Sequence, residues 1–120
     1  MKQKSFLSIL LFFLSVSVFA KSPTYSIERV EPASWWIGMN DPELQVMIYG
    51  SNISLADVEL NYEGVTISKK ALTDNPNYIF LYLNIDKNTK PGKFDIVFKK
   101  DKKTVGKFSY TLSERRKNSA

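Results

Sequence analysis

Alternation of apolar and polar residues constrains the fold of this chain more than any other feature of its sequence. Side chains of a β-strand point in turn to the two faces of a sheet, whereas an amphipathic helix repeats its apolar residues every three or four positions. Period-two sets occur at Leu44, Val46 and Ile48, at Val58, Leu60 and Tyr62, and at Phe94, Ile96 and Phe98, and a last apolar set is Val105, Phe108, Tyr110 and Leu112. About seven short strands of this kind predict an all-β, antiparallel β-sandwich.

Turn-forming residues separate the expected strands. The segment Asp74-Asn-Pro-Asn77 and the pair Pro91-Gly92 are strong turn signals, and Lys99-Lys-Asp-Lys-Lys103 is typical of a hairpin tip. The first strand is expected over Tyr25–Val30, ending before Pro32. Residues 31–42 are too irregular for a strand or a helix and are expected to form a loop.

One expected strand, Tyr78–Ile85, is apolar on both faces. Ile79, Leu81, Leu83 and Ile85 form one row, and Tyr78, Phe80 and Tyr82 form the other. A sheet face in contact with water would carry polar residues at alternate positions. Either this strand is the central one of a well-covered sheet, or its aromatic row contacts something outside the domain.

The N-terminus is typical of an export signal. Lys2 and Lys4 precede an apolar run from Phe6 to Val18. The segment Val18-Phe-Ala20 then places small residues at the two positions that a signal peptidase recognises. The run is shorter than the roughly 20 apolar residues of a membrane span, although an uncleaved anchor is the alternative. We expect a signal peptide at 1–20, one domain at 21–112 and a linker at 113–120. The mature protein is then periplasmic or secreted, with no membrane contact after cleavage.

The composition excludes most catalytic chemistry. The sequence has no histidine and no cysteine, which removes the commonest general base, thiolate catalysis and zinc sites. Its 12 acidic residues cannot be paired as acid and base from the sequence. No catalytic residue, metal ligand or cofactor is expected, so the chain by itself is not expected to be an enzyme.

The charge does not favour a nucleic-acid partner. Without Lys2 and Lys4, the 17 basic residues become 15 against 12 acidic ones, a net charge of +3. The excess lies in the lysine hairpin tip and in Arg115-Arg-Lys117, without aromatic residues among them. Solvated loop lysines explain this pattern.

The segment Trp35-Trp-Ile-Gly-Met39 is the most informative motif. One tryptophan could cap the core, the pair could anchor an interface, or the rings could stack on sugars. The candidates for interface or carbohydrate contact are Trp35, Trp36, Met39, Tyr78, Phe80 and Tyr82.

An ordered set of motifs resembles a known family. It comprises Ile27-Glu-Arg-Val-Glu-Pro32, Trp35-Trp-Ile-Gly-Met39, Asn40-Asp-Pro-Glu-Leu-Gln45, Tyr49-Gly50, Asn75-Pro-Asn-Tyr-Ile-Phe-Leu-Tyr-Leu83, Lys90-Pro-Gly-Lys-Phe94 and Tyr110-Thr-Leu-Ser-Glu-Arg115. It is similar to the N-terminal domain of bacterial cyclomaltodextrinases and neopullulanases, alpha-amylase family members of Bacteroidetes-type starch-utilisation systems. The similarity covers essentially all of residues 21–120.

The resemblance implies an immunoglobulin-like sandwich that precedes a (β/α)₈ catalytic barrel. Such a domain packs against the barrel or a second subunit. It thereby narrows the entrance to the active site, which favours small maltodextrins and cyclodextrins as substrates. The catalytic motifs of the family are absent from these residues, so hydrolysis is implied for a parent enzyme only, and the chain is expected to be a fragment or an isolated module. The alternatives are a free-standing module that binds maltodextrin or cyclodextrin, and a generic immunoglobulin-like interaction module, although the latter usually occurs in tandem repeats.

Overall fold

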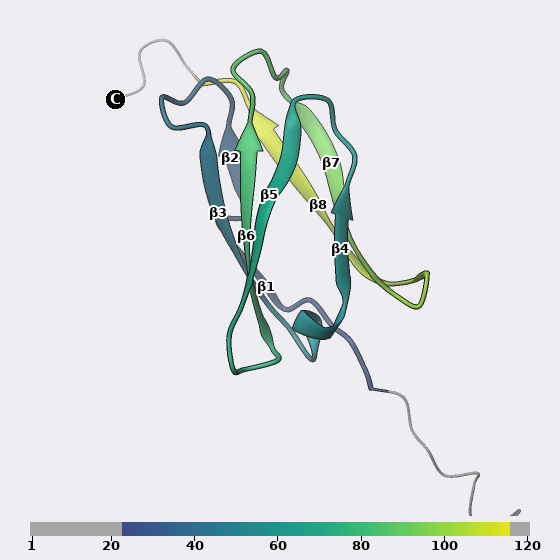
Figure 1. Ribbon diagram of the computed structural model, residues 1–120. Helices are drawn as coiled ribbons and strands as arrows, with labels where there is room; N and C mark the ends of the chain where they lie inside the picture. Colours follow the sequence, from purple (N-terminus) through teal and green to yellow (C-terminus); the bar gives the residue numbers. More distant parts are fainter. Residues whose placement is uncertain (1–22, 116–120) are drawn as a thin grey trace, which may run out of the picture.

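Residues 23–115 form a two-layer β-sandwich in the computed structural model (Figure 1). The expected signal peptide and the end of the expected linker, residues 116–120, lie outside the described residues. The elements are β1 (Arg29–Glu31), β2 (Ser34–Trp36), β3 (Glu43–Tyr49), a 3-10 turn η1 (Ile53–Leu55), β4 (Asp57–Leu60), β5 (Val65–Leu72), β6 (Tyr78–Ile85), β7 (Gly92–Lys100) and β8 (Lys103–Ser113). Within residues 23–115, no helix is long and apolar enough to cross a membrane.

Two four-stranded sheets face each other, one with strand order β1-β3-β6-β5 and the other with β2-β8-β7-β4. Without β2, these orders match the two sheets of the immunoglobulin constant-type sandwich, four strands against three. The predicted all-β sandwich is therefore confirmed, with eight strands in place of about seven.

The core lies between the sheets and consists of the rows that the alternation predicted. Val46, Ile48, Ile79, Leu81 and Leu83 from one sheet are fully buried. Opposite them lie the side chains of β7 and β8, of which Ile96, Phe98 and Tyr110 are fully buried and Leu112 nearly so. The register aligns Leu44 with Leu83 and Val46 with Leu81, which places the apolar rows of β3 and β6 on the same inner face. Burial of these rows stabilises the fold without a disulfide.

The tryptophan segment differs from the expectation. The prediction of a loop over residues 31–42 is wrong at Ser34–Trp36, because these residues form β2 and pair in parallel with β8. All the other strand pairs of the described region are antiparallel. A three-residue strand leaves no periodic signal, and its partner lies more than 70 residues later in the chain, so local sequence could not reveal the pairing.

The first expected strand is also shorter than predicted. β1 begins at Arg29, whereas the strand was expected from Tyr25. The residues before β1 still form backbone hydrogen bonds with the end of β3 and the residues that follow it. The Ser26 N–H donates to Ser51 O at 3.3 Å, and the Glu28 N–H donates to Tyr49 O at 2.8 Å.

The predicted turns at Asp74–Asn77 and at the lysine-rich tip are confirmed, whereas Gly92, which was predicted to lie in a turn, is the first residue of β7. Residues 73–77 connect β5 to β6, and Asp101 and Lys102 form the β7–β8 turn. Both turn residues have positive φ, 52° and 68°, as a two-residue type I′ hairpin requires. The lysine-rich tip therefore projects beyond the sandwich (Figure 1).

Candidate functional site

The two tryptophans lie beside the end of the last strand. Trp35 is in register with Leu112 and Trp36 with Ser113, and the Ile37 N–H donates to Ser113 O at 3.0 Å. The chain leaves the described domain two residues after Ser113. This pairing places the tryptophan segment next to the exit of the chain.

A buried tyrosine holds the start of this segment against β8. The Tyr110 hydroxyl donates to Pro32 O at 2.9 Å, and the Tyr110 side chain is completely buried. Burial raises the pKa of Tyr110 far above its usual value, so the hydroxyl remains protonated and available as a donor. The corner between β1 and β2 is thereby fixed, two residues before Ser34.

The two rings have different environments. Trp35 is half-buried and packs against the core, whereas Trp36 is 45% exposed. Their centroids are 5.3 Å apart and their planes are inclined by 54°. Two rings at this angle do not form a single flat platform. The site therefore has one exposed ring, that of Trp36, which packs against the half-buried ring of Trp35.

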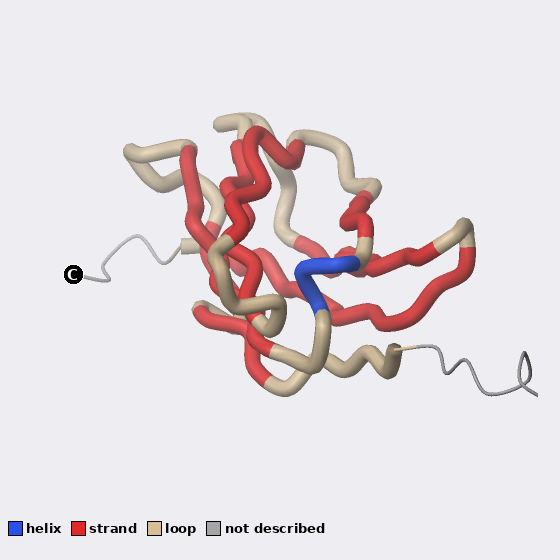
Figure 2. The backbone as a smooth tube through the Cα atoms, turned by 60° about the horizontal axis from the view of Figure 1, so that its bottom comes forward, coloured by secondary structure: helices blue, strands red, loops and turns tan. Residues whose placement is uncertain are grey.

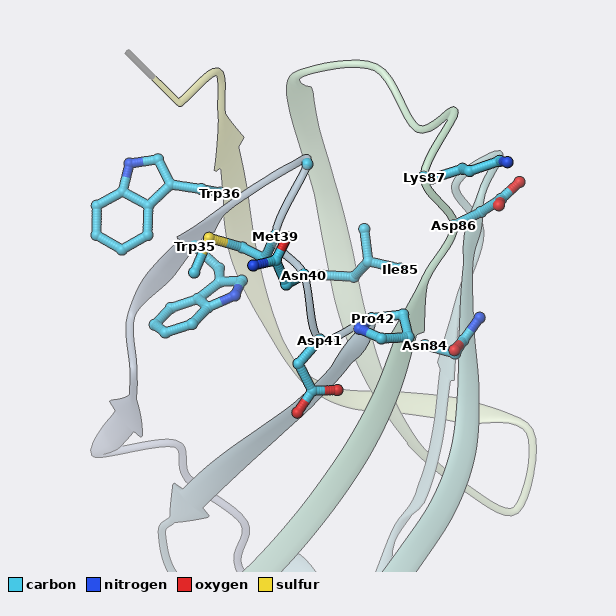
Figure 3. Close-up of a pocket in the computed structure, with 11 residues that line it drawn as sticks. Trp35, Trp36, Met39, Asn40, Asp41, Pro42, Asn84, Ile85, Asp86 and Lys87 are labelled. Carbon is cyan, nitrogen blue, oxygen red and sulfur yellow. The ribbon is translucent and has the colours of Figure 1, made fainter. Parts of the chain in front are cut away.

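A pocket of about 350 Å³ lies beside the pair (Figure 3). Its walls come from the tryptophan segment, the start of β3 and the end of β6, through Trp35, Trp36, Gly38, Met39, Asn40, Asp41, Pro42, Asn84, Ile85, Asp86 and Lys87. In Figure 3 the Met39 side chain extends toward the tryptophans, whereas Asp86 and Lys87 lie on the other side of the hollow. The volume is at the lower end of the range for small-molecule sites.

The pocket presents aromatic and amide surface. The Asp41 carboxylate accepts a hydrogen bond from the Glu43 N–H at 2.9 Å, which ties it to the start of β3. The Ile85 N–H donates to Pro42 O at 2.8 Å and joins the two segments at the base of the pocket. No cluster of three acidic side chains that could hold a metal ion occurs within residues 23–115. The arrangement can stack, pack and donate or accept hydrogen bonds.

The aromatic row of β6 lies elsewhere. Tyr78, Phe80 and Tyr82 alternate with the buried row of β6, so they project from the outer face of their sheet and are half-buried. Tyr49 lies across from Tyr78 with ring centroids 4.8 Å apart, and the Lys69 ammonium lies 5.3 Å from the Tyr82 ring centre.

The structure thus brings Trp35, Trp36 and Met39 together at one pocket and places Tyr78, Phe80 and Tyr82 on a separate face. Contact of either group with a partner or a sugar stays a prediction. Sequence reasoning missed Asn84, Asp86 and Lys87, because they join the site only through the pairing of β3 with β6.

Comparison with known proteins gives a matching family model and solved structures to which the chain is similar. The family model described as "Cyclomaltodextrinase, N-terminal" matches residues 29–116. Among solved structures, the chain is similar to titin domain M4 in its trigonal form, with 17% identity and a TM-score of 0.47, over 79% of this chain and 100% of that one. It is also similar to titin domain M7, with 15% identity and a TM-score of 0.47, over 81% of this chain and 99% of that one.

Proposed function

The chain belongs to the cyclomaltodextrinase N-terminal domain family, and from this premise we propose that it serves an exported glycoside hydrolase that degrades maltodextrins or cyclodextrins. The family supports an accessory, non-catalytic role for these residues. In the proposal, the domain packs against the catalytic barrel or a second subunit and shapes substrate access. Its tryptophan end provides the contact.

The pairing of β2 with β8 is the observation that carries the proposal. Trp36 and Ser113 are in register, so any domain that follows the described chain begins beside an exposed indole ring and the adjacent pocket. Tryptophans at the centre of protein interfaces are frequent hot spots, which cost about 2 kcal/mol or more when truncated. A partner that covers Trp36 would also close the pocket.

Binding to the barrel tests this proposal directly. The chain would be mixed with the catalytic barrel of a cyclomaltodextrinase, and binding measured by titration calorimetry. We expect Trp36→Ala to weaken binding at least about tenfold, since 1.4 kcal/mol corresponds to that factor. Leu72→Ala is the matched control, because Leu72 is 57% exposed and lies at the other end of the sandwich.

Two results would count against the proposal. One is unrelated DNA downstream of the Ala120 codon, with no barrel in any frame. The other is equal binding by wild type, Trp36→Ala and Leu72→Ala, which would place the contact away from the tryptophan end.

A second candidate function is sugar binding at the same pocket. The exposed Trp36 ring with Asn40 and Asn84 nearby is the feature that favours it, since sugars use one stacking surface and several amide partners. Maltoheptaose or β-cyclodextrin should then quench tryptophan fluorescence, because Trp35 and Trp36 both line the pocket and are the two tryptophans of the chain. An unchanged spectrum at millimolar sugar would exclude this function.

Export is part of the proposal and rests on the N-terminal sequence. Lys2, Lys4 and the apolar run before Ala20 support a signal peptide and a periplasmic or secreted protein. N-terminal sequencing of protein recovered from the producing cells should give Lys21 as the first residue.

A further inference from the structure

A second hollow adjoins the pocket beside the tryptophans. Its volume is about 310 Å³, and it is lined by Tyr62, Glu63, Gly64, Asp86, Asn88 and Lys90. Asp86 lines both hollows, so the two meet at this residue. In Figure 1 the loop of residues 86–91 joins β6 to β7 at the end where β8 finishes, and η1 lies at the opposite end, which Figure 2 turns toward the viewer. The second hollow therefore belongs to the tryptophan end.

Hydrogen bonds within the chain fix the walls of the second hollow. The Asp86 N–H donates to Gly64 O at 2.8 Å, and the hydroxyl of the buried Thr89 donates to the same oxygen at 3.1 Å. The Tyr62 hydroxyl donates to Lys90 O at 2.7 Å, which ties the turn before β5 to the loop after β6. These bonds hold the loop in one shape, and such preorganisation lowers the cost of binding a ligand.

Each hollow has an aromatic ring in its wall. Trp36 is the exposed ring of the first hollow. Tyr62 in the second is half-buried and stacks on Phe94, with ring centroids 5.1 Å apart and planes inclined by 30°. Sugar rings pack their C–H groups against aromatic rings of this kind, so each hollow offers one stacking contact.

The remaining side chains are polar and nearly balanced in charge. The two hollows together carry the carboxylates of Asp41, Glu63 and Asp86 and the ammonium groups of Lys87 and Lys90. None of these five side chains forms an ion pair within residues 23–115. Amide groups come from Asn40, Asn84 and Asn88.

This mixture of polar groups favours a neutral ligand with many hydroxyl groups. Hydroxyls donate to carboxylates and accept from ammonium groups, and amides serve both roles. A strongly charged ligand would be repelled by one of the two sets of charges. The aromatic and polar groups of the two hollows are thus those that a sugar chain uses.

We propose that the two hollows form one extended site for a linear, neutral oligosaccharide. One sugar unit stacks on Trp36, another lies against Tyr62, and the Asp86 carboxylate accepts hydrogen bonds from hydroxyls between them. This proposal rests on the second candidate function, sugar binding at the pocket beside Trp36, and adds a second subsite around Tyr62 and Asn88. The ligand is then a chain long enough to extend past Asp86.

Titration calorimetry of the full chain with maltotriose and maltoheptaose tests this arrangement. We expect maltoheptaose to bind at least about tenfold more tightly, because contacts at the second subsite act at a high effective concentration once the first is filled. Trp36→Ala should weaken the binding of both sugars.

The double change Asn88→Ala with Lys90→Ala removes polar groups of the second hollow alone. Both side chains are exposed, and the Lys90 carbonyl that accepts from Tyr62 is kept. Affinity for maltoheptaose should fall about tenfold, and affinity for maltotriose should stay within about twofold of wild type. Asn61→Ala is the matched control, because Asn61 is exposed and next to Tyr62 in the chain but lines a different hollow, with Glu59 and Asp95. It should bind both sugars as wild type does.

The possible failures are distinguishable. Equal affinities for the two sugars, each lowered by Trp36→Ala, would refute the second subsite and leave sugar binding at the first. Equal binding of maltoheptaose by the double variant and by Asn61→Ala would also refute it. An absence of heat with either sugar would overturn both sugar functions. If the double variant then bound the catalytic barrel less tightly than Asn61→Ala does, the hollows would receive a protein, and the role proposed for the tryptophan end in packing would stand.

Discussion

Replacement of Tyr110 by phenylalanine tests how the fold positions the tryptophan segment. The change removes the hydroxyl that donates to Pro32 O at 2.9 Å and keeps the ring, whose centre lies 5.8 Å from that of Phe94 and 6.3 Å from that of Phe108. The packing of the core should therefore persist. The effect isolates one hydrogen bond between β8 and the β1–β2 corner.

The expected loss in the free energy of unfolding follows from the environment of that hydrogen bond. Tyr110 is completely buried and Pro32 is half-buried, so the carbonyl of Pro32 loses a partner at a site that is partly shielded from water. Such a loss costs about 1–3 kcal/mol. In a domain of this size, each kcal/mol lowers the melting temperature by roughly 4–8 °C.

Urea denaturation and tryptophan emission together provide the assay. The midpoint should fall while the slope of the transition stays constant, because the surface exposed on unfolding is unchanged. Trp35 and Trp36 are the two tryptophans of the chain and begin three residues after Pro32, so their emission reports on the detachment of β2.

The matched control is Tyr62→Phe. The Tyr62 hydroxyl donates to Lys90 O at 2.7 Å in an exposed setting, where water can replace it. That change should cost less than about 0.5 kcal/mol. If Tyr110→Phe were as stable as Tyr62→Phe, with wild-type tryptophan emission, the role given to the Tyr110 hydroxyl would be wrong.

Three further changes test other parts of the structure. Burial raises the pKa of Tyr110, so above a pH of about 10 the Tyr110 hydroxyl loses its proton in the unfolded chain and keeps it in the folded chain. The free energy of unfolding should therefore fall as the pH rises through this range, and it should fall less in Tyr110→Phe. Urea denaturation at a series of pH values would show both trends. Trp35→Ala should lower the free energy of unfolding by about 1–3 kcal/mol because Trp35 packs against the core, whereas Trp36→Ala should lower it by less than about 1 kcal/mol. A lower melting temperature for Trp36→Ala than for Trp35→Ala would contradict the environments assigned to the two rings. Gly64→Ala should cost more than about 1 kcal/mol, because Gly64 has a φ of +93° and an added Cβ would meet the Thr89 side chain; an unchanged melting temperature would refute this.

Much of the fold could be predicted from local patterns. The strand Tyr78–Ile85 has the predicted bounds, and Ile79, Leu81 and Leu83 are buried as their alternation indicated. The turn at Asp101 is also where the lysine-rich tip predicted it. These features depend on side-chain period and turn chemistry, which neighbouring residues encode.

The candidate site could be predicted only in part. The sequence singled out Trp35, Trp36 and Met39, and the family resemblance is confirmed over residues 29–116. Asn84 and Lys87 gave no signal, since nothing in their own segment distinguishes them from ordinary surface residues. The aromatic row of β6 looked equivalent to the tryptophans in composition, yet it lies on a different face.

The sequence by itself determined the two-sheet architecture and the identity of the core, because burial selects one face of each alternating strand. Only the tertiary structure decided that Trp36 lies beside Ser113 and that Asn84 and Asp86 join the tryptophans at one pocket. The physical reason is the range of the interactions. Alternation acts between neighbours two residues apart, whereas the β2–β8 pairing and the pocket beside the tryptophans join segments far apart in the chain, which become neighbours only when the strands pair and the sheets pack.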